Sequence, residues 1–392
     1  MASTTRTIKR RVTGRVAGLW ARPRLTAAEV PALRPRRILL VRQHNQMGDM
    51  VCATPCFRAV RETWPRARTC LVTAPVNHQV VAHNPHLDEI LLFDQRIWRR
   101  PGALRAFMGR LRAFDADLAL VLNSVSFSVT SAMLGLWSSA RWVIGGDGEP
   151  FGSTVSRAYS LAMPASPDLD RHAVRHSLAP LEAVGIRTDD LSTVVVPARE
   201  QRQEAARLID TLLPPGPFWA LHPGAGKRQN LWPADRFADL AWRAARGGTP
   251  VLVLHGPADA EALDALRQAL AARQAGDGAA GAAPVVIAPA VPVGTGAALL
   301  ERCDRFLCND TGVMHVAGAV GAPTVALFGP TDPALWKPPS PVVVALRADE
   351  RQDDPRGPEY GWLESLDADT VWTAWSQLPS RTPDDPPAPV SG

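Results

Sequence analysis

The run Arg37-Ile38-Leu39-Leu40-Val41-Arg42 decides the fold class of this chain. Such a compact apolar run is typical of a strand that is buried on both faces of a parallel sheet. Residues 43–49 follow as a polar loop, residues 50–63 have helical spacing, and residues 69–73 form a second apolar run. A strand, a helix and a second strand in this order predict a β-α-β unit.

The same alternation continues on both sides of a break in the middle of the chain. The first series adds strands at 89–93, 118–122 and 142–144 and helices at 101–114 and 127–136. The second series has strands at 218–222, 250–255, 284–288, 305–308 and 324–328 and helices at 234–246, 260–273, 295–303 and 312–320. The pattern predicts two doubly wound, Rossmann-like α/β domains.

Chain length and linker composition set the predicted boundaries. A chain of 392 residues exceeds the size at which one hydrophobic core usually stops growing, so two domains are expected. The break contains a helix at 200–213 and the sequence Pro214-Pro215-Gly216-Pro217. We predict a basic, flexible arm at 1–35, a first domain at 36–199, a second domain at 200–345 with a flexible Ala/Gly-rich loop at 274–283, a C-terminal segment at 346–378 with a final helix at 367–378, and a disordered tail at 379–392.

Composition limits the cellular compartments and the classes of partner that can be expected for the protein. The net charge of +5 suggests anionic partners, but the basic residues are mostly arginines spread along the sequence, so no nucleic acid is expected. No run of 18 apolar residues occurs, which predicts a cytoplasmic protein without a transmembrane helix. The five cysteines lack C-x-x-C spacing, as expected for buried thiols in a reducing compartment. The arm at 1–35 fits either contact with an anionic membrane surface or a solvated tail.

The loop 43–49 is the first candidate site, because ligands of open α/β sheets bind beyond the carboxyl ends of the strands. Gly48 permits a tight turn, and Asp49 is expected at the start of the next helix. A carboxylate there can cap free N–H groups, or it can act as a general base. The residues alone leave both roles open.

The segment His222 to Pro233 is the second candidate site. It follows a predicted strand and opens into the small residues Pro223-Gly224-Ala225-Gly226, whose backbone N–H groups are accessible to a ligand. Lys227 comes next and supplies a mobile cation that suits a diphosphate. Lysine is scarce in this chain, occurring elsewhere only at Lys9 and Lys337, which gives Lys227 more weight than a lysine on a solvated loop would have.

The segment Cys308 to Ala317 is the third candidate. Small and polar residues end a strand there, and the next helix begins at Thr311 and Gly312, whose amides can meet phosphate oxygens. Asp310 is either a ligand of the substrate or a helix cap. His315, about one turn into the helix, either contacts substrate or packs in the core.

Two weaker features also follow predicted strands. The stretch 328–333 is most simply a structural turn. The stretch 255–259, with Asp259 and the nearby Glu261, places an acid where α/β domains hold a nucleotide ribose.

In this order, these segments resemble glycosyltransferase family 9, the heptosyltransferases that build the inner core of bacterial lipopolysaccharide. The resemblance runs from about Arg37 to Pro338 and is most specific at 38–55, 222–233 and 309–332. It implies the GT-B fold, in which two Rossmann-like domains face each other across a cleft. The first domain then binds mainly the acceptor, typically a lipid A precursor, and the second binds the nucleotide-sugar donor, typically ADP-heptose.

The resemblance also implies roles for individual residues. Asp49 corresponds to the general base, Lys227 to the residue that contacts donor phosphate, and Asp310 to the acid that holds the donor sugar. Asp259 or Glu261 corresponds to the ribose contact. The remaining donor-side residues are His222, Gly224, Thr311, Gly312 and His315, and the acceptor-side residues are Asn45 and Gly48. The loop 43–47 departs from the small polar segment usual in the family, which leaves the acceptor open.

Residues and resemblance together predict an inverting glycosyltransferase that uses no metal and no cofactor. An acceptor hydroxyl, deprotonated by Asp49, would displace the nucleoside diphosphate. Lys227, the amides at Thr311 and Gly312 and the helix dipole would stabilise the leaving group in place of a divalent cation. The predicted substrates are ADP-heptose and a lipopolysaccharide core or related surface glycan. The predicted form is a cytoplasmic monomer, either free or in peripheral contact with the inner membrane surface. The alternatives are a nucleotide-sugar epimerase of GT-B architecture and a non-catalytic nucleotide-sugar or glycan-binding protein.

Overall fold

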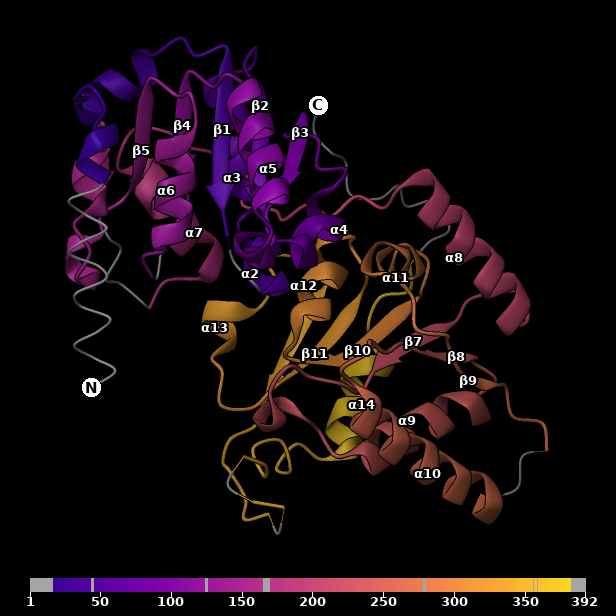
Figure 1. The fold of residues 1–392 in the computed structure, drawn as a ribbon. Coiled ribbons are helices and arrows are strands. Elements are labelled where there is room, and N and C mark those ends of the chain that lie inside the picture. Colours follow the sequence, from indigo (N-terminus) through magenta and orange to yellow (C-terminus); the bar gives the residue numbers. More distant parts are fainter. Residues whose placement is uncertain are drawn as a thin grey trace. The chain divides into compact units, whose positions relative to one another are not determined.

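The computed structural model describes residues 17–43, 46–123, 126–164, 170–277, 280–354, 356–357 and 359–381. The chain divides into two compact units between Leu191 and Ser192 (Figure 1). The second unit includes helix α8 (Arg199–Leu212), which packs against α11 (Val293–Leu300) of the same unit. Each unit has its own parallel sheet and its own core.

The first unit is built around one six-stranded parallel sheet of order β3-β2-β1-β4-β5-β6. Its strands are β1 (Arg37–Arg42), β2 (Arg68–Thr73), β3 (Glu89–Leu92), β4 (Leu118–Val121), β5 (Trp142–Gly146) and β6 (Leu161–Met163). Its helices are α2 (Met47–Cys52), α3 (Thr54–Thr63), α4 (His78–Val81), α5 (Pro101–Ala113), α6 (Val129–Trp137) and α7 (Ala173–Glu182). The central strands are buried along nearly their whole length, as the apolar runs predict.

The second unit repeats this plan with a sheet of order β12-β11-β10-β7-β8-β9. Its strands are β7 (Trp219–His222), β8 (Val251–Val253), β9 (Val285–Ile287), β10 (Arg305–Asn309), β11 (Thr324–Phe328) and β12 (Val343–Arg347). Besides α8 and α11, its helices are α9 (Ala234–Arg246), α10 (Ala260–Asp277), α12 (Gly312–Ala319), α13 (Pro333–Trp336) and α14 (Ala368–Ser376). Helix α14 returns to pack on α9 and the sheet, where Trp375 and Val371 join the core.

Both sheets have a topological switch point. Strand β1 lies between β2 and β4, and β7 lies between β8 and β10, so the chain leaves each first strand in one direction and later returns on its other side. This reversal leaves a crevice at the carboxyl ends of the two strands, which is where open α/β sheets usually bind ligands. The crevices lie at β1/β4 in the first unit and at β7/β10 in the second.

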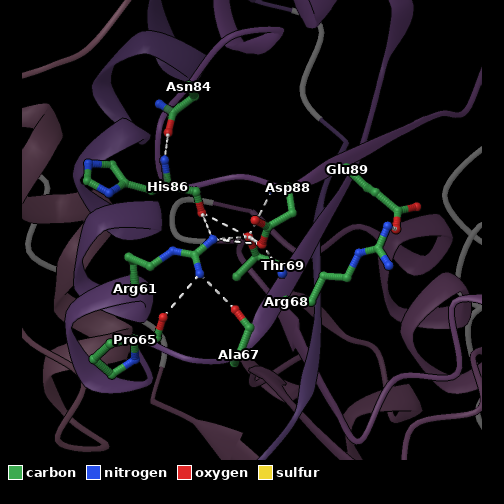
Figure 2. Close-up of polar contacts among 9 residues, drawn as sticks. All are labelled: Arg61, Pro65, Ala67, Arg68, Thr69, Asn84, His86, Asp88 and Glu89. Atoms are coloured by element: carbon green, nitrogen blue, oxygen red, sulfur yellow. Dashed lines mark hydrogen bonds and ion pairs between the residues drawn. The ribbon is translucent and has the colours of Figure 1, made fainter. Parts of the chain in front are cut away.

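A polar cluster fastens the opposite, amino-terminal edge of the first sheet (Figure 2). The Arg61 guanidinium of α3 donates to Asp88 at 2.7 Å and to the Ala67 carbonyl at 2.8 Å, and Asp88 also accepts from the Thr69 amide at 2.7 Å. Burial alone would raise the pKa of Asp88, but these bonds hold it below its ordinary value. Because this cluster lies away from the carboxyl edge, we interpret it as structural.

Part of the predicted flexible arm is ordered, so that prediction is wrong for residues 17–35. The Arg22 and Leu25 amides donate to the carbonyls of Ala158 and Ser160, both at 3.0 Å. The Arg22 guanidinium donates to the Leu136 carbonyl at 2.7 Å, and so satisfies the end of α6. The sequence around Arg22 does not distinguish an arginine that caps a distant helix from an arginine of a solvated tail. Residues 1–16 and 382–392 of the predicted arm and tail lie outside the described residues.

Two helix predictions also need correction. The predicted helix at 50–63 is two helices, α2 and α3, because Pro55 lacks the N–H that a continuous helix would use and instead stands in the first turn of α3. Residues 274–277, predicted as loop, are the last turn of α10. Extending an existing helix adds one hydrogen bond per residue, and Gly276 costs only about 1 kcal/mol relative to alanine.

The five cysteines are free and buried, as expected from their spacing. Burial raises the pKa of Cys52, Cys56, Cys70 and Cys303 to about 12 and that of Cys308 well above its ordinary value. These thiols therefore stay protonated and act as small apolar core residues. No helix in the described ranges is long and apolar enough to cross a bilayer.

Candidate functional site

Asp49 lies at the carboxyl edge of the first sheet, in the first turn of α2. The helix begins at Met47 and its N-cap position is Gln46, so Asp49 is not the N-cap residue. Gly48 is the second helical residue rather than part of a tight turn, which corrects its expected role. Asn45 lies outside the described residues. Asp49 is partly buried.

Arg42 spans the switch point of the first sheet. This last residue of β1 is only 5% exposed. Its guanidinium donates to the Leu122 carbonyl, just after β4, at 3.2 Å, and to the Asp49 carbonyl at 3.2 Å. Arg42 therefore joins the ends of both strands to the start of α2, and it places a buried cation beside the proposed base.

Hydrogen-bond donors without a partner gather at the same place. Val41 and Val121 are in register, so Gln43 and Asn123 leave neighbouring strands at the same level. In the described part of the chain, Arg42 Nε, Gln43 Nε2 and Asn123 Nδ2 are buried and have no hydrogen-bond partner. Orphaned buried donors are rare in folded proteins. This edge is therefore a candidate site for an oxygen-rich group.

Asn309 spans the switch point of the second sheet. The last residue of β10 is fully buried. Its Nδ2 donates to the carbonyls of Pro223, at 2.9 Å, and Gly224, at 3.3 Å, while its Oδ1 accepts from the Trp232 amide at 3.2 Å. Both ends of the loop 223–232 are thus fixed to the strand that leads into α12.

Asp259 fixes the same loop from its other side. Its Oδ2 lies 3.1 Å from His222 Nε2 and accepts from the Gly256 amide at 2.6 Å. Burial alone would raise the pKa of Asp259, but the bonds from His222 and Gly256 hold it below its ordinary value. A Cβ on Gly224 would stand 2.0 Å from Asp259 Oδ1, so only glycine fits there. Asp259 is therefore buried and hydrogen-bonded within the second unit.

Glu261 is the accessible acid of the predicted pair. Its side chain is 77% exposed, and one oxygen lies 3.7 Å from the Arg228 guanidinium. Arg228 also lies 3.8 Å from Glu359 and over the ring of Tyr360. Of the two acids that the sequence proposes for a ribose, Glu261 is the more exposed.

Asp310 is the centre of a polar group beside the loop 223–232. Asn230 Nδ2 donates to both the carbonyl and the carboxylate of Asp310 at 3.0 Å. Burial raises the pKa of Asp310, although the bond from the Thr331 hydroxyl, the charge of Lys227 and the bond from Asn230 act against this. Lys227 is itself exposed at the end of the small-residue loop. The structure thus brings Lys227, Asn230, Asp310 and Thr331 together.

The start of α12 completes this group. Thr311 is an extended N-cap residue that makes no side-chain capping bond, and Gly312 is the first helical residue. The first amides of a helix have no partner inside the helix, so they remain available to an anion. His315 is buried on the inner face of α12, consistent with the packing alternative that its sequence position leaves open.

Reasoning from the sequence did not single out Arg42, Gln43, Asn123, Asn230, Asn309 or Thr331. All but Asn230 stand within three residues of a strand's carboxyl end, and that position is the signal that would have found them. In the described ranges, no group of three or more His, Cys, Asp or Glu side chains is placed to hold a metal ion.

Two parallel-sheet α/β domains with polar residues at their carboxyl edges are the arrangement of the GT-B fold. The sequence pattern of glycosyltransferase family 9 (heptosyltransferase) matches residues 104–358, and the chain belongs to this family. Lipopolysaccharide heptosyltransferase 3 of Escherichia coli is 22% identical over 351 residues, which cover 87% of this chain and 97% of that protein.

Solved structures show the same fold. A family 9 glycosyltransferase from Veillonella parvula superposes with a TM-score of 0.72 at 22% identity and covers 86% of this chain and 96% of its own. The E. coli ADP-heptose lipopolysaccharide heptosyltransferase II superposes with a TM-score of 0.68 at 21% identity, covering 86% and 97%. The predicted GT-B fold and the predicted glycosyltransferase family are confirmed.

Proposed function

We propose that this heptosyltransferase-family enzyme transfers heptose from ADP-heptose to a hydroxyl of a lipopolysaccharide core, with inversion and without a metal or other cofactor. The observation that carries the proposal is the group formed by Lys227, Asn230, Asp310 and Thr331 beside the open start of α12. The E. coli relative of similar fold is an ADP-heptose lipopolysaccharide heptosyltransferase, which supports ADP-heptose as the donor. Membership in the family favours transfer over the epimerase alternative.

The donor side of the reaction belongs to the second unit. The diphosphate accepts hydrogen bonds from the first amides of α12, and Lys227 neutralises the charge that develops as the nucleoside diphosphate leaves. Asn309 and Asp259 hold the loop that carries Lys227 in position. Asp310 accepts hydroxyls of the donor sugar, and the exposed Glu261 holds the ribose.

The acceptor side belongs to the first unit. Asp49 takes the proton from the attacking hydroxyl, which forms a bond to the anomeric carbon while the bond to the diphosphate oxygen breaks on the opposite face. The unpaired donors of Arg42, Gln43 and Asn123 hold an oxygen-rich group of the acceptor. Arg42 also fixes the Asp49 backbone.

Location and assembly are part of the same proposal. The chain acts as a monomer in the cytoplasm, at the inner face of the membrane in which its glycolipid acceptor is embedded. The basic residues of positions 1–16, Arg6, Lys9, Arg10, Arg11 and Arg15, supply an attraction to anionic lipid.

One experiment tests transfer directly. Purified protein is incubated with ADP-heptose and with core oligosaccharide from a heptose-deficient strain, and the product is detected by its mass. We expect the acceptor to gain one heptose and ADP to be released. An altered sugar released without acceptor would show an epimerase, and donor binding without any product would show a binding protein.

A further inference from the structure

A cavity lies at the carboxyl edge of the second sheet, outside the group formed by Lys227, Asn230, Asp310 and Thr331. It has a volume of about 360 Å³ and is lined by the turn Gly329–Pro330 after β11, by residues 347–351 at the end of β12, and by Trp362. This volume is near the lower end of the range for small-molecule pockets, about 300–1,000 Å³. It suits one or two sugar rings.

The cavity adjoins the candidate donor site. Thr331 follows Pro330 in the chain, and its hydroxyl bonds Asp310. A Cβ on Gly329 would be 3.1 Å from both the Gln229 carbonyl and Trp362 Cβ, so Gly329 separates the loop 223–232 from Trp362. Only Thr331 thus lies between the cavity wall at Pro330 and Asp310, the acid proposed to hold the donor sugar.

The walls of the cavity are held by hydrogen bonds. The Ala348 amide donates to the Phe328 carbonyl at 2.8 Å, and the Gln352 amide donates to the Gly361 carbonyl at 2.7 Å. Gly361 has φ +81°, and a Cβ there would be 1.9 Å from the Gln352 carbonyl oxygen, so the chain can close here only with glycine. Arg351 Nε donates to the Tyr360 carbonyl at 3.2 Å. Trp362 is therefore fixed opposite residues 347–351.

The side chains that line the cavity suit a neutral, hydroxyl-rich ring. Arg347 and Arg351 supply planar donor groups, and Asp349 and Glu350 supply carboxylate acceptors. The charges of these four side chains sum to zero. A diphosphate would meet two carboxylates as well as two arginines there, so the lining offers an anion no net positive charge. The Trp362 ring supplies an apolar face against which the C–H face of a sugar can pack.

We propose that this cavity is a sugar subsite, which binds a neutral ring of the acceptor glycan other than the residue that is transferred. The inference rests on the proposed function, because it assumes a glycan acceptor. Pro330 and Thr331 stand between the cavity and Asp310, so the ring in the cavity is separate from the donor sugar. The subsite lets the second unit, and not the first alone, select the acceptor.

The test compares variants of Trp362 and Glu350 in the transfer assay with ADP-heptose and core oligosaccharide. We expect Trp362→Ala to raise the acceptor KM about tenfold, Glu350→Gln to raise it about threefold, and Trp362→Phe to keep most of the affinity. Donor KM should stay within about twofold of wild type in all three. Trp98→Ala and Glu62→Gln, which change an exposed tryptophan and an exposed acid of the first unit, are the matched controls.

The possible outcomes separate the two proposals. A higher donor KM in Trp362→Ala would assign the cavity to the donor, and an unchanged acceptor KM would remove the subsite; either result overturns the inference while transfer stands. If wild type transfers no heptose, the proposed function fails. Calorimetric titration of the same oligosaccharide into wild type and Trp362→Ala then decides the subsite by itself, and equal affinity overturns it.

Discussion

The two units of this chain share one sheet topology but use it differently at the switch point. A buried arginine, Arg42, spans the first crevice, and a buried asparagine, Asn309, spans the second. Every polar group of the Asn309 amide is paired, whereas donors of Arg42, Gln43 and Asn123 are left over among the described residues. The first edge thus keeps side-chain donors for a ligand, and the second uses its side chains to hold a loop and offers backbone amides.

Replacing Asp49, the proposed base of the first unit, is the strongest test of this division. We expect Asp49→Asn to lower kcat by about 10²–10⁴-fold, because the amide cannot take the proton of the acceptor hydroxyl. Donor KM should change little, since the donor belongs to the second unit. Full activity in this variant, with Asp115→Asn as an exposed-acid control, would show that Asp49 has only a structural role.

Removal of Lys227, the proposed phosphate-binding cation of the second unit, is expected to cause the next largest loss of turnover. Lys227→Ala should lower kcat by about 10²-fold, which corresponds to the roughly 3 kcal/mol typical of one preorganised electrostatic contact. Lys227 is exposed, so the melting temperature should not move. The exposed Arg66 of the first unit provides the control, as Arg66→Ala. Unchanged turnover and unchanged donor affinity would remove Lys227 from the mechanism.

The loop 223–232 of the second unit packs so closely on Asp259 that one added methyl group at Gly224 should displace it. Gly224→Ala places a Cβ against the Asp259 carboxylate and should lower the free energy of unfolding by about 1–3 kcal/mol. Donor KM should rise because the loop that carries Lys227 shifts. The double variant with Asp259→Ala relieves the contact, so urea unfolding should show a cost smaller than the sum of the single changes. Strict additivity would mean that the two residues do not meet.

The unpaired donors of the first unit predict a smaller, acceptor-specific effect. Gln43→Leu removes an amide nitrogen, Nε2, that has no partner within the described residues, so stability should hold or rise. Acceptor KM should rise about fivefold with donor KM unchanged. If neither KM changes, the ligand does not reach this edge.

The smallest predicted effect is a pH dependence confined to the first unit. Burial, together with the charges of Arg58 and Arg61, lowers the pKa of His86 from 6.5 to about 4. The folded state therefore resists protonation that the unfolded chain accepts. This contribution to stability is fully present above about pH 6.5 and is lost as the pH falls toward 4. Melting curves of His86→Asn should be less pH-dependent across this window than those of wild type, whereas the exposed His83→Asn should follow wild type.

Most elements could be predicted from the sequence because their signals are local. The strand Thr324–Phe328 and the helix Ala234–Arg246 have the predicted bounds, since buried apolar runs and amphipathic spacing mark them directly. The edge strand β12 (Val343–Arg347) was missed because Val343 is its only fully buried residue and prolines precede it. The ordered stretch 17–35 was missed because Arg22 and Arg24, which help to hold it, bond residues more than a hundred positions away.

The sequence by itself determined the alternation of strands and helices, the family, and the loops that carry candidate residues, because these depend on runs of neighbouring side chains. Only the tertiary structure decided that Asp259 pairs with His222 while Glu261 stays exposed, and that Arg42 and Asn309 span the two crevices. Such roles depend on which strands become neighbours and which groups lose water. Those outcomes are set by packing between distant segments, and a residue's local pattern does not contain them.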